Sequence, residues 1–100
     1  MTKIYLYDST LRDGGQTSTV NFSVLDKQVI AQKLDSLGID YIEGGWPGAN
    51  PTDNEFFENL PLLKNSKLTA FGMTRRADKS VNEDEGLNIL ANSSVKSVCI

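Results

Sequence analysis

The fold is decided by one stretch, Lys3-Ile4-Tyr5-Leu6-Tyr7-Asp8-Ser9-Thr10-Leu11-Arg12-Asp13-Gly14-Gly15-Gln16, in which an apolar segment runs into a polar loop with two glycines. The apolar and aromatic half, residues 3–7, predicts a β-strand. A helix is expected next, with Ser23 and Asp26 as a capping box at its start and Gly38 as a left-handed cap at its end. The order strand, loop, helix is the unit that the rest of the chain repeats.

The first helix is expected to bury one face. Its apolar side chains recur at helical spacing, which predicts that they lie on one side of the helix. These side chains are Leu25, Val29, Ile30, Leu34 and Leu37.

Two further units and the start of a fourth follow. Strands are expected at residues 39–43, 67–72 and 95–100, and a glycine- and proline-rich loop at residues 44–51. The second helix carries Phe56, Phe57 and Leu60, and the third spans residues 82–91. Their expected capping pairs are Thr52 with Glu55, and Ser80 with Glu83.

Repeated strand–helix units joined by short connections predict an α/β fold with a parallel sheet. Two architectures fit this order, an open doubly wound sheet and a (β/α)₈ TIM barrel. A barrel takes about 250 residues, so the 100 residues present hold only its first three to three-and-a-half units. Residues 1–100 are treated as one piece, because no linker composition marks a boundary.

Composition excludes several classes of partner and site. The net charge is −3 and no basic stretch occurs, so neither nucleic acid nor an anionic membrane is an expected partner. No apolar run approaches the roughly 18 residues of a membrane span. A single cysteine fits a reducing compartment, which favours a cytoplasmic location. The chain has no histidine, which excludes a Ser-His or Cys-His nucleophile and a histidine-bound metal within it.

The unusual polar residues follow the expected strands, where parallel α/β folds place their ligand sites. They are Arg12, Asp13 and Gln16 after the first strand, Glu43 at the end of the second, and Thr74, Arg75 and Arg76 after the third. The opposite connections, at Gly38 and residues 65–66 and 92–94, carry no comparable chemistry. This asymmetry indicates a catalytic face.

Each candidate has a functional and a structural interpretation. Asp13 suits a divalent cation as an oxygen ligand, or is a turn residue before Gly14. Arg12 suits a carboxylate or a developing enolate, or pairs with a nearby aspartate. Glu43, at the end of an apolar strand, suits proton transfer, or caps a neighbouring helix.

Other conspicuous residues favour structural roles. The pair Arg75-Arg76 is more often solvated than an anion site, and Trp46 is expected to pack the loop in which it stands. Cys99 is expected to be inert core. Residues 44–48 lack the Lys-Ser/Thr ending of a P-loop, which argues against nucleotide-phosphate binding.

The string from Asp8 to Gln16 resembles the metal-dependent barrel family that holds isopropylmalate synthase, homocitrate synthase, citramalate synthase and hydroxymethylglutaryl-CoA lyase. Residues 41–51 (Tyr-Ile-Glu-Gly-Gly-Trp-Pro-Gly-Ala-Asn-Pro), 55–57 and 70–76 look most like the citramalate synthase branch. The resemblance covers essentially all of the chain, but only the first part of the family's catalytic barrel.

The resemblance implies a Claisen-type condensation in isoleucine biosynthesis. Acetyl-CoA loses a methyl proton and adds to the keto carbon of pyruvate, and thioester hydrolysis leaves citramalate and CoA. The resemblance further implies Asp13 as a ligand of Mn²⁺, Mg²⁺ or Zn²⁺, and Arg12 and Glu43 as catalytic residues. Arg12, Gln16, Thr74 and Arg75 are the implied substrate-binding residues, and the full-length enzyme is expected to be a homodimer.

One departure from the family is the missing histidine pair. The family completes its metal site with a His-x-His pair from later strands, so this chain alone is expected to be inactive. Three alternatives remain: an isopropylmalate-type synthase for a larger keto acid, a lyase or aldolase of the same family, and a non-catalytic βα module.

Overall fold

The computed structural model describes residues 3–74, 77–93, 95 and 97–100. Its four strands form one parallel sheet in the order β1-β2-β3-β4. Their bounds are Tyr7–Asp8 for β1, Tyr41–Gly45 for β2, Lys67–Phe71 for β3 and Ser97–Cys99 for β4. A doubly wound sheet reverses its strand order at a switch point, whereas a barrel adds strands in sequence. The described strands follow the order of a barrel.

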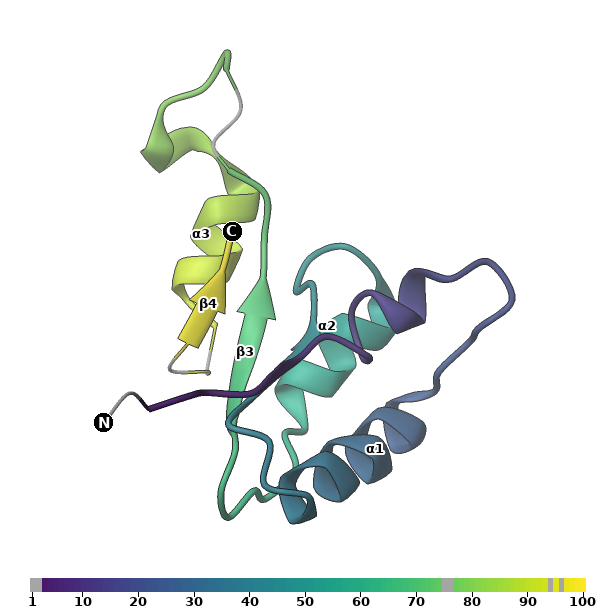
Figure 1. Ribbon diagram of the computed structural model, residues 1–100. Helices are drawn as coiled ribbons and strands as arrows, with labels where there is room; N and C mark the ends of the chain where they lie inside the picture. Colours follow the sequence, from purple (N-terminus) through teal and green to yellow (C-terminus); the bar gives the residue numbers. More distant parts are fainter. Residues whose placement is uncertain (1–2, 75–76, 94, 96) are drawn as a thin grey trace.

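Among the described residues, three α-helices connect the strands, at Val24–Ser36 (α1), Pro51–Glu58 (α2) and Glu85–Ala91 (α3). Short 3₁₀ helices lie at Gly14–Gln16 (η1) and Val81–Glu83 (η2). Figure 1 shows α1 and α2 next to each other, and both contact β2. Each connection between neighbouring parallel strands therefore carries a helix, as the sequence predicts.

The two ends of α1 confirm the sequence prediction. The Ser23 hydroxyl accepts the Asp26 N–H while the Asp26 carboxylate accepts the Ser23 N–H, both at 3.0 Å. At the other end Gly38 has φ +84°, and the N–H groups of Gly38 and Ile39 return to the carbonyls of Asp35 and Leu34. This is the Schellman arrangement, which satisfies two of the carbonyls that a helix end leaves unpaired.

The predicted apolar face of α1 is wrong in part. Leu25, Val29 and Leu37 are exposed, whereas Lys27, Ala31 and Asp35 are buried. The reason is that Lys27 and Asp35 have charged or hydrogen-bonding partners on other elements. These interactions decide which face of α1 is buried, against the spacing of its apolar residues. Ile30 and Leu34 do pack against the core as expected.

Strand limits also differ from the prediction. β1 is confined to Tyr7–Asp8, because the Leu6 carbonyl accepts the N–H groups of both Asp40 and Tyr41 and the Leu6 N–H donates to the Asp40 carboxylate. β2 begins at Tyr41 rather than residue 39 and continues through two glycines that were predicted as loop. A Cβ on Gly44 would lie 2.7 Å from the Phe56 ring, so these glycines allow α2 to approach the strand.

The capping pairs predicted for α2 and α3 are wrong. Asn50 caps α2 by accepting the Asp53 N–H at 2.8 Å, with Pro51 at the first helical position, where its fixed φ is favourable. Asp84 caps α3 by accepting the Leu87 N–H at 3.1 Å. In both cases the side chain with the right backbone geometry lies a few residues from the predicted one.

The core lies between the sheet and the helices. Its buried apolar residues come from every layer: Leu11, Ala31, Ile42, Phe56, Phe57, Ala70 and Leu90. Among the described residues, no helix is long and apolar enough to span a membrane.

Candidate active site

The loop after β1 is wound into a tight, helix-like turn. The N–H groups of Arg12 and Asp13 donate to the Ser9 carbonyl at 3.2 and 2.8 Å. Asp8 holds the start of this turn, since its carboxylate accepts the Thr10 N–H at 2.9 Å and the Thr10 hydroxyl at 3.1 Å. The turn is anchored by the Leu11 side chain, which is only 1 % exposed. Its polar residues are thereby fixed at the carboxyl end of β1.

Arg12 and Glu43 form an ion pair between this turn and β2. The Arg12 Nε–H donates to Glu43 Oε1, and the Tyr7 hydroxyl donates to Glu43 Oε2. Glu43 is 1 % exposed and stands next to an irregularity in the β2–β3 register, between Glu43 and Gly45. A buried carboxylate is stable only when it is paired and hydrogen-bonded, and both oxygens of Glu43 meet this condition.

Three more groups surround the Arg12 guanidinium. Its Nη1 lies 2.8 Å from Asp13 Oδ1 and 3.5 Å from Gln16 Oε1. The Phe71 ring, at the end of β3, lies 4.0 Å from Arg12 Cζ, and its edge contact with Trp46 (5.2 Å between centroids) holds it in place. Within the part of the chain that the structure describes, Nη2 has no hydrogen-bond partner, so this nitrogen is available to a bound anion.

The charge of Arg12 is secured by its neighbours. Burial opposes that charge, but the hydrogen bond that Arg12 donates to Glu43 and the negative charges of Glu43 and Asp13 raise the pKa of Arg12 above its usual value. The guanidinium is therefore a permanent cation in a fixed orientation. Such a group stabilises developing negative charge without reorganising during a reaction.

Asp13 supplies one donor of the kind that a divalent cation prefers. Its side chain is 59 % exposed, and its Oδ2 accepts the Ser9 hydroxyl at 2.9 Å. Over residues 3–74, 77–93, 95 and 97–100, no group of three or more His, Cys, Asp or Glu side chains converges into a metal site. The described residues thus fit a metal as one exposed carboxylate ligand rather than as a complete coordination shell.

The structure brings together four of the predicted site residues: Arg12, Asp13, Gln16 and Glu43. Thr74 is exposed three residues beyond β3 and makes none of the hydrogen bonds or ion pairs of that group. Arg75 and Arg76 lie outside the described residues. Trp46, expected to pack its loop, contacts the ring of Phe71 at the end of β3.

Sequence reasoning missed two residues that hold the site, Tyr7 and Phe71. No sequence signal was available for them, because only the register between strands places Tyr7, Glu43 and Phe71 on the same face of the sheet. Cys99, predicted as inert core, is only half-buried.

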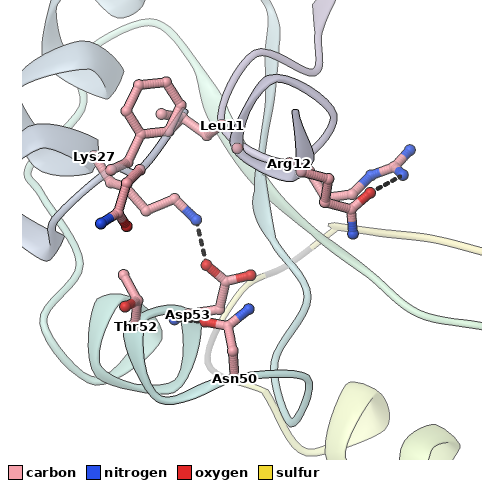
Figure 2. A pocket seen from close by; sticks show the side chains of 10 residues that line it. Leu11, Arg12, Lys27, Asn50, Thr52 and Asp53 are labelled. Carbon is pink, nitrogen blue, oxygen red and sulfur yellow. Dashed lines mark hydrogen bonds and ion pairs between the residues drawn. The ribbon is translucent and has the colours of Figure 1, made fainter. Parts of the chain in front are cut away.

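A small polar pocket lies beside the ion pair (Figure 2). It has a volume of about 260 Å³ and is bounded by the turn after β1, by α1 and by the start of α2. Lys27 Nζ lies 2.5 Å from Asp53 Oδ1 at this pocket. Figure 2 shows the Arg12 guanidinium pointing away from this pair. The other Asp53 oxygen accepts the Trp46 N–H at 2.9 Å.

Comparison with known proteins identifies the family of the chain. The HMGL-like family matches residues 3–83. The chain belongs to the HMGL-like family. The domain of this family is a TIM barrel, and the chain covers its N-terminal part.

Several curated relatives of this HMGL-like chain are named (R)-citramalate synthase. The protein of Aquifex aeolicus is 54 % identical over 100 residues, which cover 98 % of this chain and 19 % of that protein. The protein of Sulfolobus acidocaldarius is 46 % identical over 94 residues, which cover 92 % of this chain and 18 % of that protein. A 2-isopropylmalate synthase of Listeria innocua is 43 % identical over 79 residues, which cover 78 % of this chain and 15 % of that protein.

These matches fall in the N-terminal part of the relatives. The HMGL-like chain spans about a fifth of the length of the citramalate synthases that it matches. The family likeness inferred from residues 8–16, and the preference for the citramalate synthase branch, are both confirmed.

Proposed function

We propose that the chain is the N-terminal part of the catalytic barrel of an acyltransferase that condenses acetyl-CoA with pyruvate to form citramalate. The observation that carries this proposal is the Arg12 guanidinium, held by Glu43 and Asp13 over the Phe71 ring. Its support from relatives is the set of (R)-citramalate synthases that match nearly the whole chain. A cytoplasmic location, a homodimeric full-length enzyme and a place in isoleucine synthesis belong to the same proposal.

Arg12 binds and orients the keto acid in this mechanism. Its Nη2, which has no hydrogen-bond partner among the described residues, donates to a carboxylate or keto oxygen, and its charge stabilises the oxygen that becomes negative as the new carbon–carbon bond forms. Gln16, next to Arg12, contacts the same substrate, and Thr74 and Arg75 contribute from beyond β3. Asp13 holds a divalent cation (Mn²⁺, Mg²⁺ or Zn²⁺), which when bound polarises the carbon under attack.

Glu43 has two parts in the proposal. In the present geometry it is the counter-ion that fixes Arg12. Proton transfer by Glu43 requires one of its oxygens to exchange its present partner, Arg12 or Tyr7, for the substrate. The histidine pair that the family uses for its metal is absent from this chain, so turnover is proposed only for a longer protein that carries it.

Exposed apolar side chains on the outer strands support this part of the proposal. Ile4 and Leu6, beside β1, are 79 % and 52 % exposed, and Val98 of β4 is 52 % exposed. β1 and β4 are the edge strands of the described sheet. In a complete barrel, such side chains are buried against the remaining strand–helix units. A non-catalytic βα module gives no comparable reason for them.

The proposal is tested with the full-length protein, acetyl-CoA, Mn²⁺ or Mg²⁺ and a panel of keto acids. CoA release with pyruvate, together with citramalate as the product, is the expected result. Release with 2-oxoisovalerate but not pyruvate would instead identify an isopropylmalate-type synthase, the second candidate, which the Listeria relative favours. Absence of CoA release with every keto acid contradicts both synthase functions.

A further inference from the structure

The Tyr7 hydroxyl holds the one oxygen of Glu43 that Arg12 leaves free. Tyr7 lies on β1, Glu43 on β2, and Arg12 in the turn after β1. The Tyr7 ring is itself set by stacking on Tyr41, with 6.3 Å between centroids and 29° between planes. The phenol therefore approaches Glu43 from a fixed direction.

Two donors in fixed directions determine how a carboxylate is turned. The terminal torsion of a glutamate is broad, so a single hydrogen bond leaves the plane of the group poorly defined. With the Tyr7 O–H on Oε2, the plane is set, and so is the direction in which Oε1 meets the Arg12 Nε–H. Without Tyr7, Oε2 of the buried Glu43 loses its donor, so the plane of the carboxylate, and with it the hold of Oε1 on Arg12, is no longer fixed.

We propose that Tyr7 is a positioning residue, which sets the orientation of the Arg12 guanidinium through Glu43. In this arrangement the Tyr7 hydroxyl bonds to Glu43 and not to Arg12. It acts by fixing the Glu43 carboxylate that anchors Arg12. The kinetic part of its test rests on the proposed condensation, whereas the structural part does not.

The chemistry of Tyr7 suits this task. Burial, followed by the hydrogen bond to Glu43, raises the pKa of the Tyr7 phenol well above its usual value. The hydroxyl therefore stays a donor throughout the range in which enzymes work.

The first test measures the accessibility of Arg12 rather than activity. The full-length protein is treated with phenylglyoxal, and the modification rate of Arg12 is followed by mass spectrometry of its peptide. Tyr7→Phe is expected to raise this rate severalfold. Tyr5→Phe is the matched control, because Tyr5 lies two residues earlier and its ring also packs near Tyr41, with 6.1 Å between ring centroids. This variant is expected to leave the modification rate of Arg12 unchanged.

The second test asks whether Tyr7 acts through Glu43. In a Glu43→Ala background, adding Tyr7→Phe is expected to change the Arg12 modification rate no further, since the link is already lost. A wild-type rate in Tyr7→Phe, or an additive effect in the double variant, overturns the proposal.

The third test is kinetic. Tyr7→Phe is expected to lower kcat about tenfold, the equivalent of one hydrogen bond to a charged group, with little change in KM for pyruvate. Unchanged kcat beside faster Arg12 modification overturns the link from orientation to catalysis. If the wild-type protein releases no CoA, the proposed function fails, while the modification experiments still decide the role of Tyr7.

Discussion

Arg12 has five donor N–H groups in a rigid plane, and the structure uses this shape. Nε meets Glu43, Nη1 meets Asp13, and the flat face of the group lies over Phe71. Lysine has a compact ammonium that cannot satisfy these contacts at once. The requirement at this position is therefore for a guanidinium and not merely for a positive charge.

We predict that Arg12→Lys lowers kcat by ~10²–10³-fold, the usual loss when a preorganised donor to a developing oxyanion is removed. Because a cation remains beside Glu43, the melting temperature should change by only a few degrees. CoA release by the full-length protein and thermal unfolding measure the two effects. Activity within threefold of wild type would show that Arg12 does not stabilise the transition state.

Asp13 lies on the exposed side of the same turn, so its role is separable from stability. We predict that Asp13→Asn weakens Mn²⁺ binding by the full-length protein ~10-fold or more, because a ligating carboxylate is lost, while the melting temperature stays the same. Calorimetric titration measures the affinity. Asp78→Asn, at another exposed aspartate, is the control that should leave it unchanged; equal affinity in both variants would remove Asp13 from the metal site.

At the scale of elements, the connection between α2 and β3 depends on one buried side chain of α1. Asp35 is 6 % exposed, and its carboxylate accepts three successive backbone N–H groups, from Lys64 at 2.8 Å and from Asn65 and Ser66 at 2.7 Å each. The hydrogen bond from Lys64, with those from Asn65 and Ser66, lowers the pKa of Asp35 to about 2.

This shift predicts acid sensitivity of defined sign. A carboxylate whose pKa is lower in the folded chain stabilises the fold above its unfolded pKa of about 3.9. That contribution falls away as the pH drops from about 4 through about 2. Asp35→Asn should therefore lower the melting temperature by several degrees at pH 7 and flatten its decline below pH 4. Parallel unfolding curves for variant and wild type between pH 7 and pH 2 would contradict this.

Local signals predicted those element ends that depend on local hydrogen bonds. Ser23 with Asp26 and Gly38 were found because a capping box and a Schellman end involve only neighbouring residues. The end of β2 was missed because Gly44 and Gly45 have their conformation from the approach of α2, which is a tertiary contact. The cap of α2 was missed because Asn50 and Thr52 are both good caps, and Pro51 decides between them.

The candidate site divides in the same way. Arg12, Asp13, Gln16 and Glu43 were predicted together because carboxyl ends of parallel strands share an edge. Tyr7 and Phe71 lie within strands and look like ordinary apolar residues in the sequence. Only the register of the sheet shows that they hold Glu43 and Arg12.

At the scale of the whole molecule, the buried Lys27–Asp53 pair joins the first strand–helix unit to the second. Lys27 of α1 is 2 % exposed, Asp53 of α2 is 8 % exposed, and Asp53 also accepts the N–H of Trp46 in the loop after β2. A Cβ on Gly45 would lie 2.7 Å from Asp53 Cγ and 2.8 Å from Lys27 Nζ, so the strand is shaped around this pair. The Lys27–Asp53 pair takes the place of the apolar contacts that the spacing of hydrophobic residues along α1 predicts.

We predict that Lys27→Met destabilises the protein by about 3–5 kcal/mol, because it leaves a buried carboxylate without its cation. The double variant Lys27→Met/Asp53→Asn should recover most of this loss, since the neutral amide oxygen still accepts the Trp46 N–H and no buried charge remains. Urea unfolding of the full-length protein measures both, with Lys33→Met, at an exposed lysine of α1, as the control. A double variant no more stable than Lys27→Met would mean that the two units are joined by packing around the Lys27 stem and not by the charge pair.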